Sequence, residues 1–145
     1  MPRLHHLAII CSDYPRSKRF YTEILGLPIL AETFRPERNS YKLDLLLATQ
    51  ADALDPHLCA TLPRLELFSF PDPPPRVTNP EARGLRHLAL AIDPSHAGLD
   101  QELARLAALG VPAEPVRIDD TPTGRGKRYT FIRDPDDLPI ELYEA

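Results

Sequence analysis

Two histidines and two glutamates stand at matching places in the two halves of this 145-residue chain. His6 and His87 are each followed by Leu-Ala near the start of an apolar segment, and Glu66 and Glu141 each lie between apolar neighbours of a later segment. Imidazole nitrogens and carboxylate oxygens suit a borderline or hard divalent ion such as Zn, Ni, Co, Mn or Fe(II). Four such ligands leave one or two positions of an octahedral ion for water or substrate. The residue types therefore predict a metal site made of His6, Glu66, His87 and Glu141.

An internal repeat carries these four residues. Three segments recur in order and at nearly constant offsets, which indicates a duplicated unit of about 70 residues. The matched segments are Leu4–Ile10 with Leu85–Ala91, Leu25–Pro28 with Leu109–Pro112, and Arg64–Phe68 with Pro139–Tyr143. A single histidine at a strand start is more often structural than a ligand, and a glutamate in an apolar strand often faces solvent. The joint placement of all four, rather than any one of them, therefore carries the prediction.

Alternation along the strands predicts which side chains share a face. His6 falls on one face with Ala8 and Ile10, while His5 points the other way; Glu66 falls on one face with its neighbours two residues away, Arg64 and Phe68. If the two units pack with pseudo-twofold symmetry, the two histidines and two glutamates converge on one concave surface.

The hydrophobic pattern predicts the order βαβββ in each unit, hence an α+β fold. In the first unit we expect strands at 5–11, 29–33, 41–48 and 62–70, a helix entered at 12–15 and ended at Gly26, and a loop at 49–61 with helical potential at 51–54. In the second unit we expect strands at 84–92, 113–118, 129–133 and 138–143, and a helix opened by Asp93-Pro94-Ser95 and ended at Gly110. We expect one domain over 1–145, with module 1 at about 3–70, a Pro-rich linker at 71–83 and module 2 at about 84–145.

The composition and charge of the chain argue against two classes of binding partner, nucleic acids and membranes. A net charge of −4 and a pI near 5.7 argue against a nucleic-acid partner. The chain has no apolar run long enough for a membrane span and no apolar signal-peptide core near Met1, so we expect a cytoplasmic protein without a membrane partner. Cys11 and Cys59 are expected to be free thiols. His57 and His96 have no counterpart in the repeat and are expected on the surface.

Taken together, the motifs resemble the vicinal oxygen chelate superfamily, which includes glyoxalase I, extradiol dioxygenases, fosfomycin resistance enzymes and bleomycin resistance proteins. The resemblance covers almost the whole chain, and it is greatest to the small bacterial glyoxalase-like lyases. The residues that carry it are His6–Ile9, Asp13–Ser17, Phe20-Tyr21, Leu25–Leu27, Leu65–Leu67, Glu66–Pro71, Gly84–Ala89, Asp134–Asp136 and Ile140–Leu142.

This resemblance implies two βαβββ modules that form an incomplete barrel, with one His and one Glu ligand per module. If the family's metal ligands are transferred to the matching positions of this chain, His6, Glu66, His87 and Glu141 bind one divalent ion. The ion chelates two adjacent oxygens of a small-molecule substrate and stabilises an enediolate, as in a metal-dependent lyase or isomerase. Glu141 is the candidate catalytic base, with Glu66 as its counterpart on the other substrate face. A homodimer is also implied, with each site built within one chain or between two.

Some positions depart from the glutathione-using enzymes. The family's glutathione-holding Arg and Asn correspond here to Ile10 and Phe70, and an apolar pair cannot replace a charge-assisted clamp on a carboxylate, so glutathione use is doubtful. Asp137 replaces a glycine of the family at a position where φ is often positive. Other cations are candidates for holding an anionic substrate, and Arg128→Ala is then expected to raise the KM for a carboxylate or phosphate. They are Arg125, Lys127 and Arg128, with Arg35, Arg38 and Lys42 in the first module.

Two other functions stay open. A metal-free binding protein of the bleomycin-resistance type would sequester a small molecule in the same cleft, although it is expected to have lost the ligands that this chain keeps. An extradiol-type dioxygenase would need Fe(II) or Mn(II) with two histidines and one glutamate, and Glu66 as a fourth ligand argues against the open position for oxygen.

Overall fold

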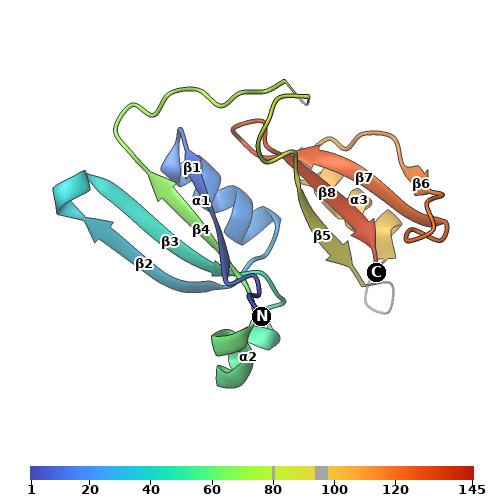
Figure 1. Ribbon diagram of the computed structural model, residues 1–145, viewed down its shortest axis with the longest axis horizontal. Helices are drawn as coiled ribbons and strands as arrows, with labels where there is room; N and C mark the ends of the chain where they lie inside the picture. The colour runs from blue at the N-terminus through green and yellow to red at the C-terminus, as the bar shows by residue number, and fades with distance from the viewer. Residues whose placement is uncertain (80, 94–97) are drawn as a thin grey trace. The chain divides into compact units, whose positions relative to one another are not determined.

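Each half of the chain folds into its own four-stranded mixed sheet, with a helix packed against it (Figure 1). The computed structural model describes residues 1–79, 81–93 and 98–145, and the chain divides into the units Met1–Arg76 and Val77–Ala145. Where it is described, the segment 71–83 forms neither helix nor strand. No helix within these described ranges has both the length and the apolar character that a membrane span requires.

The first unit has the sheet order β1-β4-β3-β2, in which β1 and β4 are parallel and the other pairs are antiparallel. Helix α1 contacts β4 on one face of this sheet. The strands are β1 (His6–Cys11), β2 (Ile29–Arg35), β3 (Ser40–Leu46) and β4 (Arg64–Ser69). The helices are α1 (Tyr14–Arg19), the π-helix η1 (Phe20–Ile24), the 3-10 helices η2 (Pro36–Arg38) and η3 (Asp52–Leu54), and α2 (Pro56–Thr61).

The second unit repeats this topology in the order β5-β8-β7-β6, again with a parallel first pair. Helix α3 contacts β8. The elements are β5 (Leu88–Ile92), α3 (Gly98–Ala108), β6 (Arg117–Asp119), β7 (Lys127–Arg133) and β8 (Pro139–Glu144). The expected βαβββ order is therefore confirmed in both units.

Local signals place the helix boundaries of the first unit. The Asp13 carboxylate accepts a hydrogen bond from the Arg16 amide at 3.0 Å, which caps α1 as expected from its N-terminal residues. Gly26 has a φ of +72°, the left-handed conformation that commonly ends a helix. The helical potential at 51–54 is confirmed by η3, but the expected loop is wrong over 56–61, where Asp55 caps α2 and Pro56 occupies its first turn.

In the second unit, two strands are shorter than expected. β5 begins at Leu88 rather than Gly84 because its parallel partner β8 begins only at Pro139, which leaves residues 84–87 outside the ladder. β6 is limited to Arg117–Asp119 because Pro115, just ahead of it, has no amide to donate. The expected helix opening at Asp93-Pro94-Ser95 and the expected surface position of His96 fall on or beside 94–97, outside the described residues.

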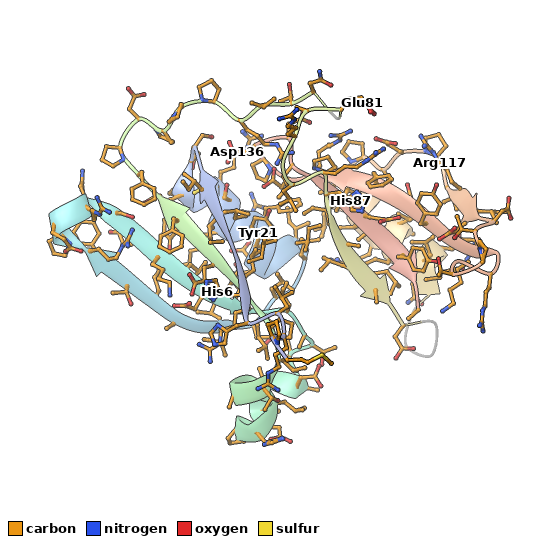
Figure 2. All side chains as sticks on the ribbon, viewed as in Figure 1. His6, Tyr21, Glu81, His87, Arg117 and Asp136 are labelled. Carbon is orange, nitrogen blue, oxygen red and sulfur yellow. The ribbon has the colours of Figure 1, made fainter. Side chains whose placement is uncertain are left out.

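Alternation puts the leucines of each sheet on the helix-covered face. Leu43, Leu65 and Leu67 are fully buried there, and so is Tyr21 of η1, which Figure 2 labels. Burying each leucine contributes about 1.5–3 kcal/mol. In the second unit the fully buried side chains include Leu99, Leu106, Ile132, Ile140 and Leu142. The opposite faces of the two sheets include the charged residues Lys42, Asp44, Glu66 and Glu141.

Three smaller expectations are confirmed. Cys11 and Cys59 are free thiols, and His57 is exposed on α2. Asp137 has a φ of +63°, in the left-handed region that aspartate tolerates better than most residues. The preceding Asp134 carboxylate accepts hydrogen bonds from the amides of Asp136 at 2.9 Å and Leu138 at 2.7 Å, which stabilises this turn.

Candidate metal centre

The first His–Glu pair lies on the sheet face away from α1. In the parallel β1–β4 ladder, His6 is opposite Arg64 and Ala8 is opposite Glu66, so the two side chains point to the same side. The distance from His6 Nε2 to Glu66 Oε2 is 3.9 Å, with the glutamate side chain only 13% exposed. On the other side of the ring, His6 Nδ1 lies 2.8 Å from His5 Nδ1. If His6 donates this hydrogen bond, its Nε2 lone pair is free to face Glu66 and bind a cation.

Two further charged residues of β3 join this pair. Asp44 is directly opposite Glu66 in the antiparallel β3–β4 ladder, and Lys42 is two residues away on the same face. The Lys42 Nζ lies 2.8 Å from Glu66 Oε1 and 2.9 Å from Asp44 Oδ1. Partial desolvation acts to lower the pKa of Lys42, but its hydrogen bonds to Glu66 and Asp44 outweigh this and raise it above the ordinary value. One Glu66 oxygen is therefore bound to an ammonium, and the other faces His6.

The second His–Glu pair is closer and less crowded by charge. His87 lies just ahead of β5, as labelled in Figure 2, and its Nε2 is 3.0 Å from Glu141 Oε2. The His87 ring meets Phe131 edge to face at a centroid distance of 5.4 Å. Phe131 is opposite Glu141 in the β7–β8 ladder, the position that Asp44 has opposite Glu66. The register position of Lys42 is taken by Tyr129.

These donors fit a divalent ion of the expected kind. Metal–nitrogen and metal–oxygen bonds of about 2.0–2.2 Å place neighbouring ligand atoms about 3.0–3.4 Å apart. The His87–Glu141 distance of 3.0 Å falls in this range, and the His6–Glu66 distance of 3.9 Å is somewhat wider. His87 Nδ1 is buried without a hydrogen-bond partner among the described residues. In the part of the chain that the structure describes, no group of three or more His, Cys, Asp or Glu side chains is arranged to hold a metal, so each unit offers a pair of ligands.

Arg128, expected among the cations for an anionic substrate, has acidic partners within its own unit. Arg128 lies on the opposite face of its sheet from Glu141 and is already bound by two acids. Its Nε donates to Glu144 at 2.9 Å, and its Nη1 donates to both oxygens of Asp100 on α3 at 3.1 Å. The hydrogen bonds to Glu144 and then to Asp100 raise the pKa of Arg128. The guanidinium thus joins α3 to the sheet.

An open cavity of about 490 Å³ lies elsewhere, on the α1 side of the first sheet. Its wall includes Tyr14 and Tyr41, whose rings stack at 4.8 Å, and the exposed ring of Phe34. Tyr14 donates to Glu32 at 2.7 Å; its partial burial, followed by this hydrogen bond, raises its pKa. Because Tyr41 alternates with Lys42 along β3, the cavity is on the other side of the sheet from the His6–Glu66 pair.

Two βαβββ units with matching His–Glu pairs define the class of this protein. The chain belongs to the Glyoxalase/Bleomycin resistance protein/Dioxygenase superfamily, whose family model matches residues 3–142. It is 49% identical to the uncharacterized protein YwkD of Bacillus subtilis, over 97% of this chain and 95% of that protein. The crystal structure of the glyoxalase family protein from Enterococcus faecalis matches with a TM-score of 0.76 and 40% identity, covering 98% of this chain and 97% of the other. The trypanothione-dependent glyoxalase I of Leishmania major matches with a TM-score of 0.69 and 25% identity, over 99% and 87% of the two chains.

Among the functional residues, the sequence reasoning missed Asp44, and it grouped Lys42 with other cations rather than with Glu66. A signal was present, since Lys42 and Asp44 are two residues apart in a strand whose other members are mostly leucines. Two charged residues at that spacing share one face. Which residues of the neighbouring strand they meet depends on the register.

Proposed function

We propose that this protein is a metal-dependent lyase or isomerase of the glyoxalase type, acting on a small molecule with two adjacent oxygens. The observation that carries the proposal is the pairing of one histidine with one glutamate in each unit, where each glutamate is opposite an alanine that follows its histidine by two residues. The likeness to a glyoxalase I of known structure supports the same class.

In this proposal His6, Glu66, His87 and Glu141 hold one divalent ion, with each site built within one chain or between two copies. The bound ion would hold the vicinal oxygens of the substrate and stabilise the negative charge that develops on them. The histidines contribute neutral nitrogens and the glutamates contribute charge, a donor set that suits Zn, Ni, Co, Mn or Fe(II).

The surroundings of the two glutamates suggest different roles. Glu66 gives one oxygen to the Lys42 ammonium and is held in place by it. Within the described part of the chain Glu141 has no Lys or Arg partner; it faces the ring of His87, with Phe131 as its cross-strand neighbour. A carboxylate that no neighbouring ammonium holds is freer to move from the ion to within hydrogen-bond reach of a substrate carbon. We therefore assign Glu141 as the base that takes the proton from one substrate carbon and returns it to the adjacent one, and Glu66 as its less mobile counterpart.

The substrate we propose is not a glutathione adduct. Ile10 is 57% exposed, and Phe70 stacks on Phe68 at 6.0 Å, so both residues present apolar surface at the places where the related enzymes hold glutathione. Neither of these two side chains can itself donate a hydrogen bond to a carboxylate of glutathione.

The test combines metal content with turnover. The protein is purified without a metal-affinity tag or added chelator, and metal per chain is measured by mass spectrometry for the unchanged protein, His6→Ala and Glu141→Gln. We expect about one ion per chain in the unchanged protein, with most of it lost in His6→Ala. The control His57→Ala alters an exposed histidine of α2 and should keep the ion.

Turnover is followed as thioester formation from methylglyoxal with a panel of small thiols that includes glutathione. Glu141→Gln should lower kcat by about 10²–10⁴-fold, the usual contribution of a general base. Glu144→Gln, on the same strand but the opposite face, should leave kcat near that of the unchanged protein. Full activity of Glu141→Gln with its metal retained would refute the role of Glu141. No metal as purified, and none taken up on soaking, would instead favour a sequestering protein, whereas iron would direct the assays to ring-cleaving dioxygenase substrates.

A further inference from the structure

Arg35, at the end of β2, carries a positive charge that no acid of the described residues neutralises. Its Nη2 donates to the Ser40 hydroxyl at 2.9 Å, and its Nε is buried with no hydrogen-bond partner in that part of the chain. A buried N–H without a partner costs about 1–3 kcal/mol, and in a native site it needs an explanation. A ligand that accepts this hydrogen bond is one explanation with chemical content.

The guanidinium of Arg35 rests on two aromatic rings. Its central carbon lies 4.8 Å from the centre of the Phe68 ring and 5.5 Å from that of Phe70, and the two rings are stacked within 12° of parallel. Cation–π contact fixes the position of the guanidinium without using its N–H donors. Several donors are thereby left to face a ligand in a defined orientation.

This arginine is on the same sheet face as the first metal-ligand pair. Arg35 is opposite Ser40, which lies on the same face of β3 as Lys42 and Asp44. Of these two, Lys42 contacts Glu66 and Asp44 is directly opposite it. The Lys42 charge is already matched by two carboxylates. Among the described residues Arg35 has no carboxylate partner on this face, and neither has Arg64, whose Nη2 donates to the Cys59 carbonyl at 3.4 Å. Phe68 is two residues beyond Glu66 on β4, which corresponds to about 7 Å along the strand.

We propose that Arg35, supported by Phe68 and Phe70, binds an anionic group of the substrate, a carboxylate or a phosphate, beside the chelating pair on the same sheet face. Planar guanidinium donors match both groups in a two-pronged hydrogen bond. The inference rests on the proposed function for the chelating part, and it specifies the substrate class as a small acid rather than a neutral carbonyl compound.

The test compares three probes that share one chelating hydroxamate and differ in the tail. Acetohydroxamate has a neutral tail, succinic monohydroxamate has a carboxylate, and phosphonoacetohydroxamate has a phosphonate. Calorimetric titration of the zinc-loaded protein should show at least one anionic probe binding about tenfold or more tightly than acetohydroxamate, the size expected of charge-assisted hydrogen bonds. The preferred tail then separates a carboxylate site from a phosphate site.

Arg35→Met should abolish this tail preference and leave the acetohydroxamate Kd unchanged. Arg35→Lys should keep part of it, which separates loss of charge from loss of packing. Arg19→Met should keep all of it because it removes an exposed arginine of α1. A tail preference that persists in Arg35→Met would overturn the inference, and so would its absence from the unchanged protein.

Failure of the chelate proposal would be seen separately, as metal-loaded protein that does not bind acetohydroxamate. In that case methylphosphonate and acetate are titrated into the metal-free protein and followed by nuclear magnetic resonance. Binding that is lost in Arg35→Met would still support the anion site, and the same response in both proteins would overturn it.

Discussion

Replacing Lys42 with methionine removes the one ammonium that lies between two carboxylates on the first sheet. Methionine keeps the length of the chain and its apolar stem while deleting the charge. Asp44 and Glu66 then face each other across β3 and β4, with side chains only 12% and 13% exposed. Directly opposed like charges on paired strands destabilise a sheet.

The size of the effect follows from the burial of the three groups. Exposed ion pairs contribute about 0–1 kcal/mol, whereas breaking a fully buried pair costs about 3–5 kcal/mol. Lys42 is 28% exposed and makes two such contacts, at 2.8 and 2.9 Å, so it lies between these limits. We expect Lys42→Met to lower the free energy of unfolding by about 2–3 kcal/mol.

Urea unfolding at neutral pH, followed by circular dichroism, measures this change. The double variant Lys42→Met/Asp44→Asn should recover part of the loss, because it removes one of the opposed charges. Lys18→Met is the matched control, since Lys18 has only Glu32 as an ionic partner and both are about one-third exposed; its loss should be within about 1 kcal/mol. A Lys42→Met loss no larger than that of Lys18→Met, with no recovery in the double variant, would refute the reasoning.

Two further predictions concern the second unit. Hydrogen bonds from Arg128 lower the pKa of Glu144 below its ordinary value of 4.5. This glutamate therefore stabilises the folded state fully at a pH above 4.5, and the stabilisation is lost as the pH falls through the lowered pKa. Melting temperatures between pH 7 and pH 3 should therefore fall less steeply in Arg128→Met than in the unchanged protein, and parallel curves would contradict this coupling. Gly124→Ala would bring a Cβ into collision with the Asp119 carboxyl group, whose Oδ2 accepts from Tyr143 at 3.0 Å, so we expect a melting temperature lower by a few degrees. An unchanged melting temperature would mean that the Asp119 side chain moves aside at no cost.

The short helix α2 shows where sequence reasoning stopped short. Asp55 followed by Pro56 is a local sequence signal for the start of a helix. The helix has only six residues, however, and so short a segment shows too little hydrophobic periodicity to distinguish a helix from a loop. The prediction of a longer strand at β6 was wrong for a non-local reason. Its β-branched residues suggested a longer strand, and the pairing available beside Pro115 ended it.

The sequence by itself determined the repeat, the βαβββ order of each unit and the faces of the strands, because these follow from local periodicity and alternation. It therefore predicted His6 and Glu66 as metal ligands without any knowledge of the fold. The tertiary structure decided which cations meet which acids: Lys42 binds Glu66, Arg128 is bound by acids on the far face, and Arg35 rests on Phe68. The physical reason is that register is a non-local property. The residue opposite a given position in a sheet is set by how the whole apolar face packs, and no stretch of sequence around that position specifies it.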